Sequence, residues 1–409
     1  MKKLLPLLGL FLLCVSCDNG GQKQAGHPQS FDYAPDFKVL KVDESRLERI
    51  DALLQEYVDN GLLPHALTFV AKDGQVIHHK AFGWRNLENR IPLEKDDIFI
   101  MYSQTKAVTT ISLMTLYEQG KFQLDDPVSK YIPEMTDRVY VDANDRNNNA
   151  TREAASPVTI RHLLCHTSGI SGHRFVPGQQ RSRFETLADY VKDLVQAPLI
   201  FDPGTDFNYH PASDVVAYLV EYFSGKTLQD YFKEVIFEPL GIVDMAHYFD
   251  ISLQDRFVTV YNERNGKLEP ARGGNQFSED RRYAAGAIGL YGTIEGYARM
   301  LQMVLNYGEF NGKRILGRRT IELMKVNQLP TDGAFQFGLG FQIQPAVLGA
   351  REDILSPLAP GGVLAWGGMA NTDYIIDHTE NMIILLYTNR MPDTMVWEKF
   401  LNTVYQALE

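Results

Sequence analysis

The chain contains very few cysteines. Only Cys14, Cys17 and Cys165 occur among 409 residues. The first two lie in an apolar N-terminal segment. Once Cys14 is removed with this segment and Cys17 is modified, only Cys165 remains and no internal disulfide can form. Cys165 stands in the apolar sequence His-Leu-Leu-Cys-His, where we expect a buried, unreactive thiol. The folded body must therefore be stabilised by packing.

The sequence also lacks concentrated positive charge. Its formal net charge is −11, from 40 Lys and Arg against 51 Asp and Glu, and there is no basic run. Nucleic acid is not expected as a partner, because phosphate binding needs clustered cations. Glycine-rich dinucleotide and phosphate loops are absent, as is the Gly-x-Ser-x-Gly turn of α/β-hydrolases. We expect no cofactor.

No metal-binding motif is complete. His162 and His166 lie one helical turn apart and His78 and His79 are adjacent, but no His-Glu-x-x-His and no third ligand accompanies them. The polar segment 136–157 has only part of the spacing of a calcium-binding loop. We expect structural histidines, a solvated loop and no metal site.

No apolar run is long enough to span a bilayer, which takes ~20 residues. The N-terminal run Leu4–Leu13 follows two lysines and precedes Ser16 and Cys17, which is the layout of an export signal. Residues 1–17 resemble a bacterial lipoprotein signal, which implies lipid attachment at Cys17. Cleavage after Ser16 without lipid is the alternative. We expect an exported protein, held by lipid on a bacterial membrane and facing the periplasm or the cell exterior.

The remaining chain divides into a tether and a body. Residues 18–42 are rich in Gly, Gln, Pro and Asp, which favours a tether between anchor and body. Residues 43–409 are expected to form one domain. Its early part contains two β-rich runs separated by Lys72–Gln75, and its late part has a second hairpin pattern within residues 373–389.

Mostly helical segments lie between these two hairpins, and several begin at Ser, Thr or Asp and end at Gly. We therefore predict an α+β fold with one antiparallel sheet built from both chain ends and flanked by helices. The sheet lobe should comprise about residues 43–100 and 330–409. A mostly helical lobe should be inserted between them.

Ser103 and Lys106 form the only Ser-x-x-Lys of the chain, at the start of an apolar helical segment. Side chains three positions apart in a helix are neighbours, so the amine can accept the hydroxyl proton and activate the serine as a nucleophile. The N–H groups at a helix start also favour the negative charge that develops during acyl transfer. The alternative is a helix-capping serine followed by a surface lysine.

The motif and its surroundings resemble the penicillin-recognising serine enzymes, which include class C β-lactamases, DD-peptidases and family VIII carboxylesterases. Similar stretches run from about Glu44 to the end of the chain. They include PHALTFVAKDGQVIHHKAFG, TIRHLLCHTSGI, PGTDFNYHPASDVVAYLVEYFSG and IFEPLGIVDM. This resemblance implies a β-lactamase/transpeptidase-like fold and a reaction through an acyl-enzyme.

The second motif of that superfamily centres on a tyrosine, commonly as Tyr-x-Asn, and here it corresponds to Tyr209 without the asparagine. Beside Lys106 its phenolate would be favoured by the cation, which would make it a proton shuttle between Ser103 and the leaving group. The alternative is a tyrosine that packs at a helix start. A literal Tyr-x-Asn at Tyr387–Asn389 falls in the wrong order, and we attribute it to chance.

The third motif is usually Lys-Thr-Gly or His-Thr-Gly, and Trp366-Gly367-Gly368 stands in its place, as in family VIII esterases. By this resemblance the backbone N–H groups of Ser103 and Met369 form the oxyanion hole. Trp366 in place of lysine removes a cation that would bind a substrate carboxylate. This favours neutral esters.

The expected function is that of a serine hydrolase acting on small ester substrates, with amides or β-lactams as further possibilities. The alternatives are a DD-peptidase or D-amino acid peptidase acting on cell-wall peptides, and a non-catalytic scaffold that keeps the fold. The expected partners are a small ester or peptide-like substrate and the membrane that holds the anchor. The sequence makes no prediction about oligomeric state.

Overall fold

The structure is a computed structural model that describes residues 27–144, 149–171, 183–209, 211–271, 283–330, 335–345 and 356–409. The predicted signal with Cys17 and the first part of the predicted tether lie outside these ranges. Across the described ranges, none of the helices combines the length and the apolar character that crossing a bilayer requires.

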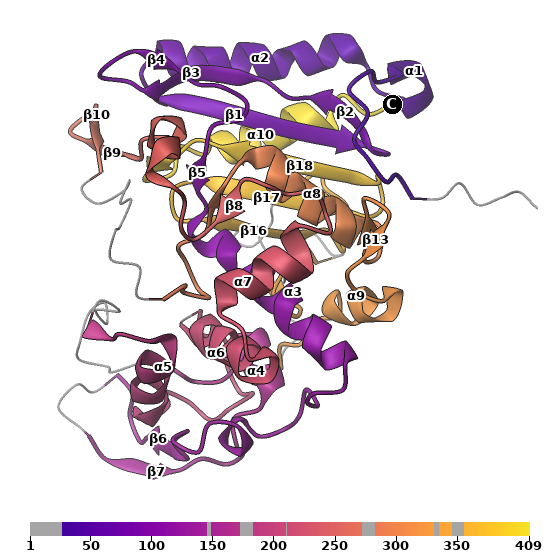
Figure 1. The fold of residues 1–409 in the computed structure, drawn as a ribbon. Coiled ribbons are helices and arrows are strands. Elements are labelled where there is room, and N and C mark those ends of the chain that lie inside the picture. Colours follow the sequence, from indigo (N-terminus) through magenta and orange to yellow (C-terminus); the bar gives the residue numbers. More distant parts are fainter. Residues whose placement is uncertain are drawn as a thin grey trace, which may run out of the picture.

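One antiparallel sheet of nine strands forms the centre of the molecule (Figure 1). Eight strands run in the order β14 (Gln336–Phe337), β15 (Gln342–Ile343), β16 (Leu364–Gly368), β17 (Thr372–Asp377), β18 (Met382–Tyr387), β1 (His65–Lys72), β3 (Ala81–Asn86) and β4 (Ile91–Pro92), and β2 (Gln75–His78) pairs with β1. Strand β1 pairs with β18, from Leu67 opposite Tyr387 to Lys72 opposite Met382. The two chain ends therefore meet inside one sheet, as the sequence predicts.

The helices are α1 (Phe37–Leu40), α2 (Glu44–Asp59), α3 (Thr105–Glu118), α4 (Ile160–Leu164), α5 (Leu187–Gln196), α6 (Ala212–Ser224), α7 (Leu228–Phe232), α8 (Ile294–Leu305), α9 (Arg318–Met324) and α10 (Val396–Tyr405). Short 3-10 or π-helical turns span Tyr102–Gln104, Val128–Lys130, Lys233–Phe237 and Ile251–Arg256. The small sheets contain β5 (Phe99–Ile100), β11 (Tyr291–Gly292) and β8 (Met245–Ala246); β10 (Lys267–Pro270), β9 (Tyr261–Arg264) and β19 (Arg390–Met391); β12 (Glu309–Phe310) and β13 (Lys313–Arg314); and β6 (Arg138–Tyr140) and β7 (Thr151–Glu153).

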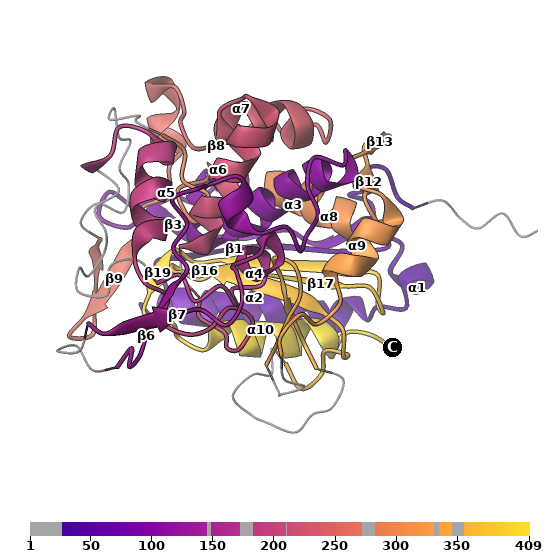
Figure 2. The ribbon, with the colours of Figure 1, turned by 90° about the horizontal axis from the view of Figure 1, so that it is seen from below.

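Both faces of the sheet are buried, because alternate side chains of each strand point to opposite faces. One face packs on α2 and α10 and the other on α3 and α8, and Figure 2 shows the sheet between these two layers. On β18, Ile383 and Leu385 join the core on the α8 side, whereas Ile384 and Leu386 join the core on the α2 side. This explains why β18 is an unbroken apolar run.

Helix α3 connects the sheet to the helical lobe that contains α4, α5 and α6 (Figure 1). Its side chains are buried without interruption from Thr105 to Leu116, which is typical of a helix in the middle of a protein. The predicted architecture, a sheet from both ends with a helical lobe inserted between them, is confirmed. The residues that precede α3 are therefore held at the junction of the two lobes.

The tether prediction does not hold for residues 27–42, which belong to the folded body. The ring of Phe31 lies 4.9 Å from that of Phe69 and 5.3 Å from that of Phe310. The backbone N–H of Asp32 donates to the Gly74 carbonyl at 2.9 Å. The prediction rested on the polar composition of the segment. Its aromatic side chains, such as Phe31, gain stability by burying their apolar surface against the body.

The buried His65 predicts a loss of stability in mild acid. Burial lowers its pKa from 6.5 to about 4, so between these pH values the unfolded chain binds a proton that the folded chain does not. The free energy of unfolding should decrease as the pH is lowered through this window. His65 should contribute at most about 1.4 kcal/mol per pH unit to this decrease. His65→Gln should make the slope of urea-unfolding free energy against pH shallower. The matched control, His27→Gln on the surface, should leave the slope unchanged.

Candidate active site

Ser103 lies in the 3-10 turn that leads directly into α3, and its hydroxyl contacts Lys106. Lys106 Nζ lies 3.2 Å from Ser103 Oγ and donates to the carbonyl of Ala287 at 2.8 Å, and the lysine is only 7% exposed. Neither the 3-10 turn nor α3 has a side-chain cap. The alternative of a capping serine with a surface lysine is therefore wrong. The two predicted residues form one buried polar pair.

Tyr209 joins this pair from the loop before α6. Its ring lies 4.5 Å from Lys106 Nζ, and its hydroxyl accepts a hydrogen bond from the indole N–H of Trp366 at 3.0 Å. A hydrogen bond also links the hydroxyl groups of Tyr209 and Ser103. Four residues that the sequence singles out are thus brought together from α3, the Tyr209 loop and β16.

The structure does not support the expected phenolate form of Tyr209. Burial raises its pKa to about 12, although the hydrogen bonds from Ser103 and Trp366 act in the opposite direction. Lys106 Nζ lies over the face of the ring and not beside the phenol oxygen. Tyr209 is consequently a neutral phenol at neutral pH, able to give a proton to a developing alkoxide.

Strand β16 runs beside the turn that carries Ser103. A Cβ placed on Gly368 would lie 2.5 Å from the carbonyl oxygen of Met101, and one placed on Gly367 would collide with the Asp373 carboxyl group. Gly368 is therefore needed for the strand to come this close to the turn, and Gly367 leaves room for the Asp373 carboxyl group. Met369 follows at the end of β16 with its side chain 64% exposed.

Gln104 is the residue of the site that the sequence did not reveal. Its side chain is fully buried and donates to the Thr372 carbonyl at 2.7 Å, while it accepts from the Tyr387 hydroxyl at 2.6 Å. The Tyr297 hydroxyl donates to the Gln104 backbone carbonyl at 3.0 Å. Tyr387, attributed to chance as part of a Tyr-x-Asn, thus contacts the residue that follows the nucleophile. No local sequence signal announces these contacts.

The His-Thr-Ser-Gly corner after α4 supports the Tyr209 side of the site. His166 has a left-handed backbone (φ 58°), its carbonyl accepts from Asn208 N at 2.9 Å, and its ring packs edge-on against Tyr209 at 4.9 Å. Rings of Phe207 and Phe337 lie on the same histidine. The Tyr209 loop is therefore fixed by both backbone and ring contacts.

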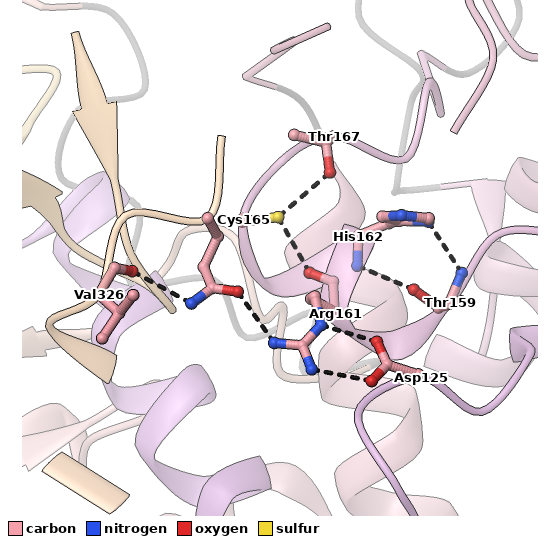
Figure 3. A network of polar contacts seen from close by, with 8 residues as sticks. Asp125, Thr159, Arg161, His162, Cys165, Thr167 and Val326 are labelled. Carbon is pink, nitrogen blue, oxygen red and sulfur yellow. Dashed lines mark hydrogen bonds and ion pairs between the residues drawn. The ribbon is translucent and has the colours of Figure 1, made fainter. Parts of the chain in front are cut away.

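Polar contacts of α4 hold this corner in turn (Figure 3). Arg161 forms a two-point ion pair with Asp125, and the Cys165 thiol donates to the Arg161 carbonyl and contacts Thr167 Oγ1, each at 3.1 Å. Cys165 is buried, as predicted, and this burial raises its pKa, which is typical of unreactive thiols. His162 closes a capping box with Thr159 at the start of α4. Among the described residues no three side chains are grouped as metal ligands.

A serine that contacts a lysine one turn later, with a tyrosine beside them at the edge of an antiparallel sheet, defines a serine hydrolase of β-lactamase-like fold. The chain belongs to the Beta-lactamase family, whose profile matches residues 50–399. It is 26% identical to the esterase EstB of Burkholderia gladioli, over 83% of this chain and 90% of that protein. It is 24% identical to a putative D-alanyl-D-alanine carboxypeptidase of Escherichia coli K12, over 94% and 90% of the two chains.

The solved structure of EstCE1, described as a hydrolase with promiscuous acyltransferase activity, has the same fold. It superposes with a TM-score of 0.75 and 22% identity, covering 88% of this chain and 99% of that one. The fold and the enzyme class predicted from the sequence are thereby confirmed.

The Gln104 contacts predict a specific order of stabilities. Gln104→Leu removes the amide but leaves the Tyr387 hydroxyl and the Thr372 carbonyl buried without it, which should lower the free energy of unfolding by about 2–4 kcal/mol. Tyr387→Phe removes one hydroxyl and leaves Gln104 its other contacts, so it should cost only about 1 kcal/mol. Urea unfolding of both variants measures the difference. Equal losses of unfolding free energy in the two variants would show that the Gln104 amide does not stabilise the turn through both of its contacts.

Proposed function

We propose that this serine hydrolase cleaves small neutral esters through an acyl-enzyme on Ser103. The observation that carries the proposal is the contact of Ser103 Oγ with Lys106 Nζ, together with the hydrogen bond between the Tyr209 hydroxyl and the same serine. This places a nucleophile, a base and an acid within reach of one carbonyl group.

In the first half of the reaction Ser103 Oγ attacks the ester carbonyl and its proton passes to the neutral amine of Lys106. The carbonyl oxygen becomes an oxyanion, which we assign to the backbone N–H groups of Ser103 and Met369, each worth roughly 3–4 kcal/mol in other hydrolases. Collapse of the intermediate breaks the bond to the alcohol, and Tyr209 donates its proton to the leaving alkoxide. Lys106 restores the Tyr209 proton.

In the second half water takes the place of the alcohol. It attacks the acyl carbonyl while Lys106 takes up its proton. Collapse of the intermediate breaks the bond to Ser103 Oγ, which receives a proton from Tyr209, and Lys106 then returns a proton to Tyr209. Because the Tyr209 phenol has a pKa of about 12, it holds its proton at neutral pH until an alkoxide, a stronger base, forms beside it. This favours an acid role for Tyr209 and leaves the base role to Lys106.

The preference for neutral substrates rests on Trp366. An indole has a single N–H and no positive charge, and here that N–H is used by Tyr209. Trp366 therefore has no donor left for a substrate carboxylate, whereas a lysine at this place would provide a cation. The similarity to the esterase EstB supports the same substrate class.

Cleavage of D-alanyl peptides is the second candidate, favoured by the similarity to the putative carboxypeptidase of E. coli. Such a substrate ends in a carboxylate, and its binding would require a cation from another part of the chain. The two candidates share Ser103, Lys106 and Tyr209 and differ only in what the site binds.

The purified protein should hydrolyse p-nitrophenyl acetate and butyrate, and Ser103→Ala should reduce kcat by at least about 1,000-fold because the nucleophile is lost. Ser112→Ala is the matched control, since Ser112 is a buried serine on α3 whose hydroxyl donates to the Val108 carbonyl of the same helix. Nitrocefin and a D-Ala-D-Ala peptide are assayed alongside. Cleavage of the peptide alone would reject the ester preference, and unchanged ester turnover by Ser103→Ala would reject the mechanism.

We also propose that the protein is exported and carries lipid on Cys17. The support is the N-terminal layout of two lysines, a short apolar run and Ser16-Cys17. In cells fed a clickable fatty acid the wild-type chain should be labelled and recovered with membranes. Cys17→Ser should lose both properties, while Cys165→Ser should keep them. Membrane recovery without lipid label would contradict the proposal.

A further inference from the structure

We infer that Asp214 is a positioning residue for Lys106, which it controls through the backbone of Ala287. The inference rests on the proposed function of Lys106 as the base for Ser103. Asp214 lies in the first turn of α6 and is fully buried, and its Oδ1 accepts the backbone N–H of Ala287 at 3.0 Å. The carbonyl of that same residue accepts a hydrogen bond from Lys106 Nζ at 2.8 Å.

The contact with Ala287 decides where the amine stands. Lys106 Nζ reaches the Ala287 carbonyl as well as Ser103 Oγ at hydrogen-bond distance, and the contact with Ala287 is the shorter of the two. A lysine side chain has four rotatable bonds, so a fixed acceptor is needed to keep the amine 3.2 Å from the serine. Fixing Ala287 therefore fixes the distance over which the proton must move.

The segment that carries Ala287 is wedged between α3 and α6. An added Cβ on Gly286 would collide with the Ser213 carbonyl oxygen and the Ala217 side chain, both on α6. From α3 the Thr109 hydroxyl donates to the Gly286 carbonyl at 2.8 Å. His247 Nε2 donates to the Ala285 carbonyl at 2.9 Å. Asp214 thus holds the residue nearest to the lysine, and Thr109 and His247 hold the two residues before it.

A carboxylate is expensive to bury, and its use here has a physical reason. Hydrogen bonds from a backbone N–H to an ionised acceptor are about twice as strong as those between neutral groups. A backbone segment without a helix or strand ladder of its own has few other partners for this N–H. A buried acceptor from α6 therefore supplies a rigid attachment point where the secondary structure supplies none.

The test compares Asp214→Ala with Asp214→Asn in the full chain. Alanine removes the acceptor, and kcat for p-nitrophenyl butyrate should fall about 10- to 100-fold with KM changed less than about threefold, because the amine loses its position while substrate binding is untouched. Asparagine keeps an oxygen at the Oδ1 position and should retain at least about a third of the wild-type kcat. Hydrogen–deuterium exchange of a peptide spanning residues 283–290 should speed up in the alanine variant and stay slow in the asparagine variant.

A second pair keeps the inference testable if Asp214→Ala does not fold. Thr109→Val removes the hydroxyl that anchors Gly286 at constant shape, and Thr109→Ser keeps the hydroxyl. The valine variant should show the same loss in kcat and the same faster exchange over residues 283–290, and the serine variant should show neither.

Two results would overturn the inference. The first is an equal loss of kcat in Asp214→Asn and Asp214→Ala, which would mean that the charge acts and not the hydrogen bond to Ala287. Faster exchange over residues 283–290 with an unchanged kcat would mean that the segment does not position Lys106. Failure of the proposed function is separate, because it appears as ester turnover by Ser103→Ala and leaves the exchange measurements intact.

Discussion

The buried amide of Gln104 holds the nucleophile turn against the sheet. Its side chain bonds to Thr372 on β17 and Tyr387 on β18, and its backbone carbonyl bonds to Tyr297 on α8. A buried polar group without a hydrogen-bond partner costs about 1–3 kcal/mol. The turn is therefore most stable in the one position where Gln104 contacts all three elements. Ser103 precedes Gln104 and α3 follows it. The hydrogen bonds of Gln104 therefore hold the turn that carries Ser103, while the Ala287 carbonyl holds the amine of Lys106 near it.

Two positions around Ser103 and Lys106 differ from the motifs that the resemblance leads one to expect. Where the resemblance leads one to expect a lysine, an indole N–H reaches Tyr209, and where an asparagine is expected after the tyrosine there is none. An uncharged donor stabilises a phenolate less than a cation does, so the burial of Tyr209 dominates and its pKa stays raised. The substitution at Trp366 therefore alters the proton chemistry of Tyr209 as well as the charge that a substrate meets.

The parts of the structure that the sequence predicts are those with local signals. The two hairpins have turn residues, and several helices, such as α2, α5 and α8, begin at a capping side chain. Ser103 and Lys106 are close in the chain, so their contact follows from helix geometry. Gln104 carries no such signal, because its side-chain partners lie 268 and 283 positions away. Asp214 looks like an ordinary first-turn acid, and only the folded chain brings Ala287 to it. The error at residues 27–42 has another cause, since average composition conceals a single well-placed ring such as Phe31.

A sheet made from both chain ends also sets when the site can exist. A chain synthesised as far as residue 330 contains Ser103, Lys106 and Tyr209, but none of the strands β14 to β18. It holds the three reacting side chains without the carbonyl of Thr372, the hydroxyl of Tyr387 or the indole of Trp366 that arrange them. Contacts so distant in sequence also form late in folding, because loop closure must come first. The active site can therefore form only after the last fifth of the polypeptide has been made. A fragment that lacks this part contains the reactive groups but not their active arrangement.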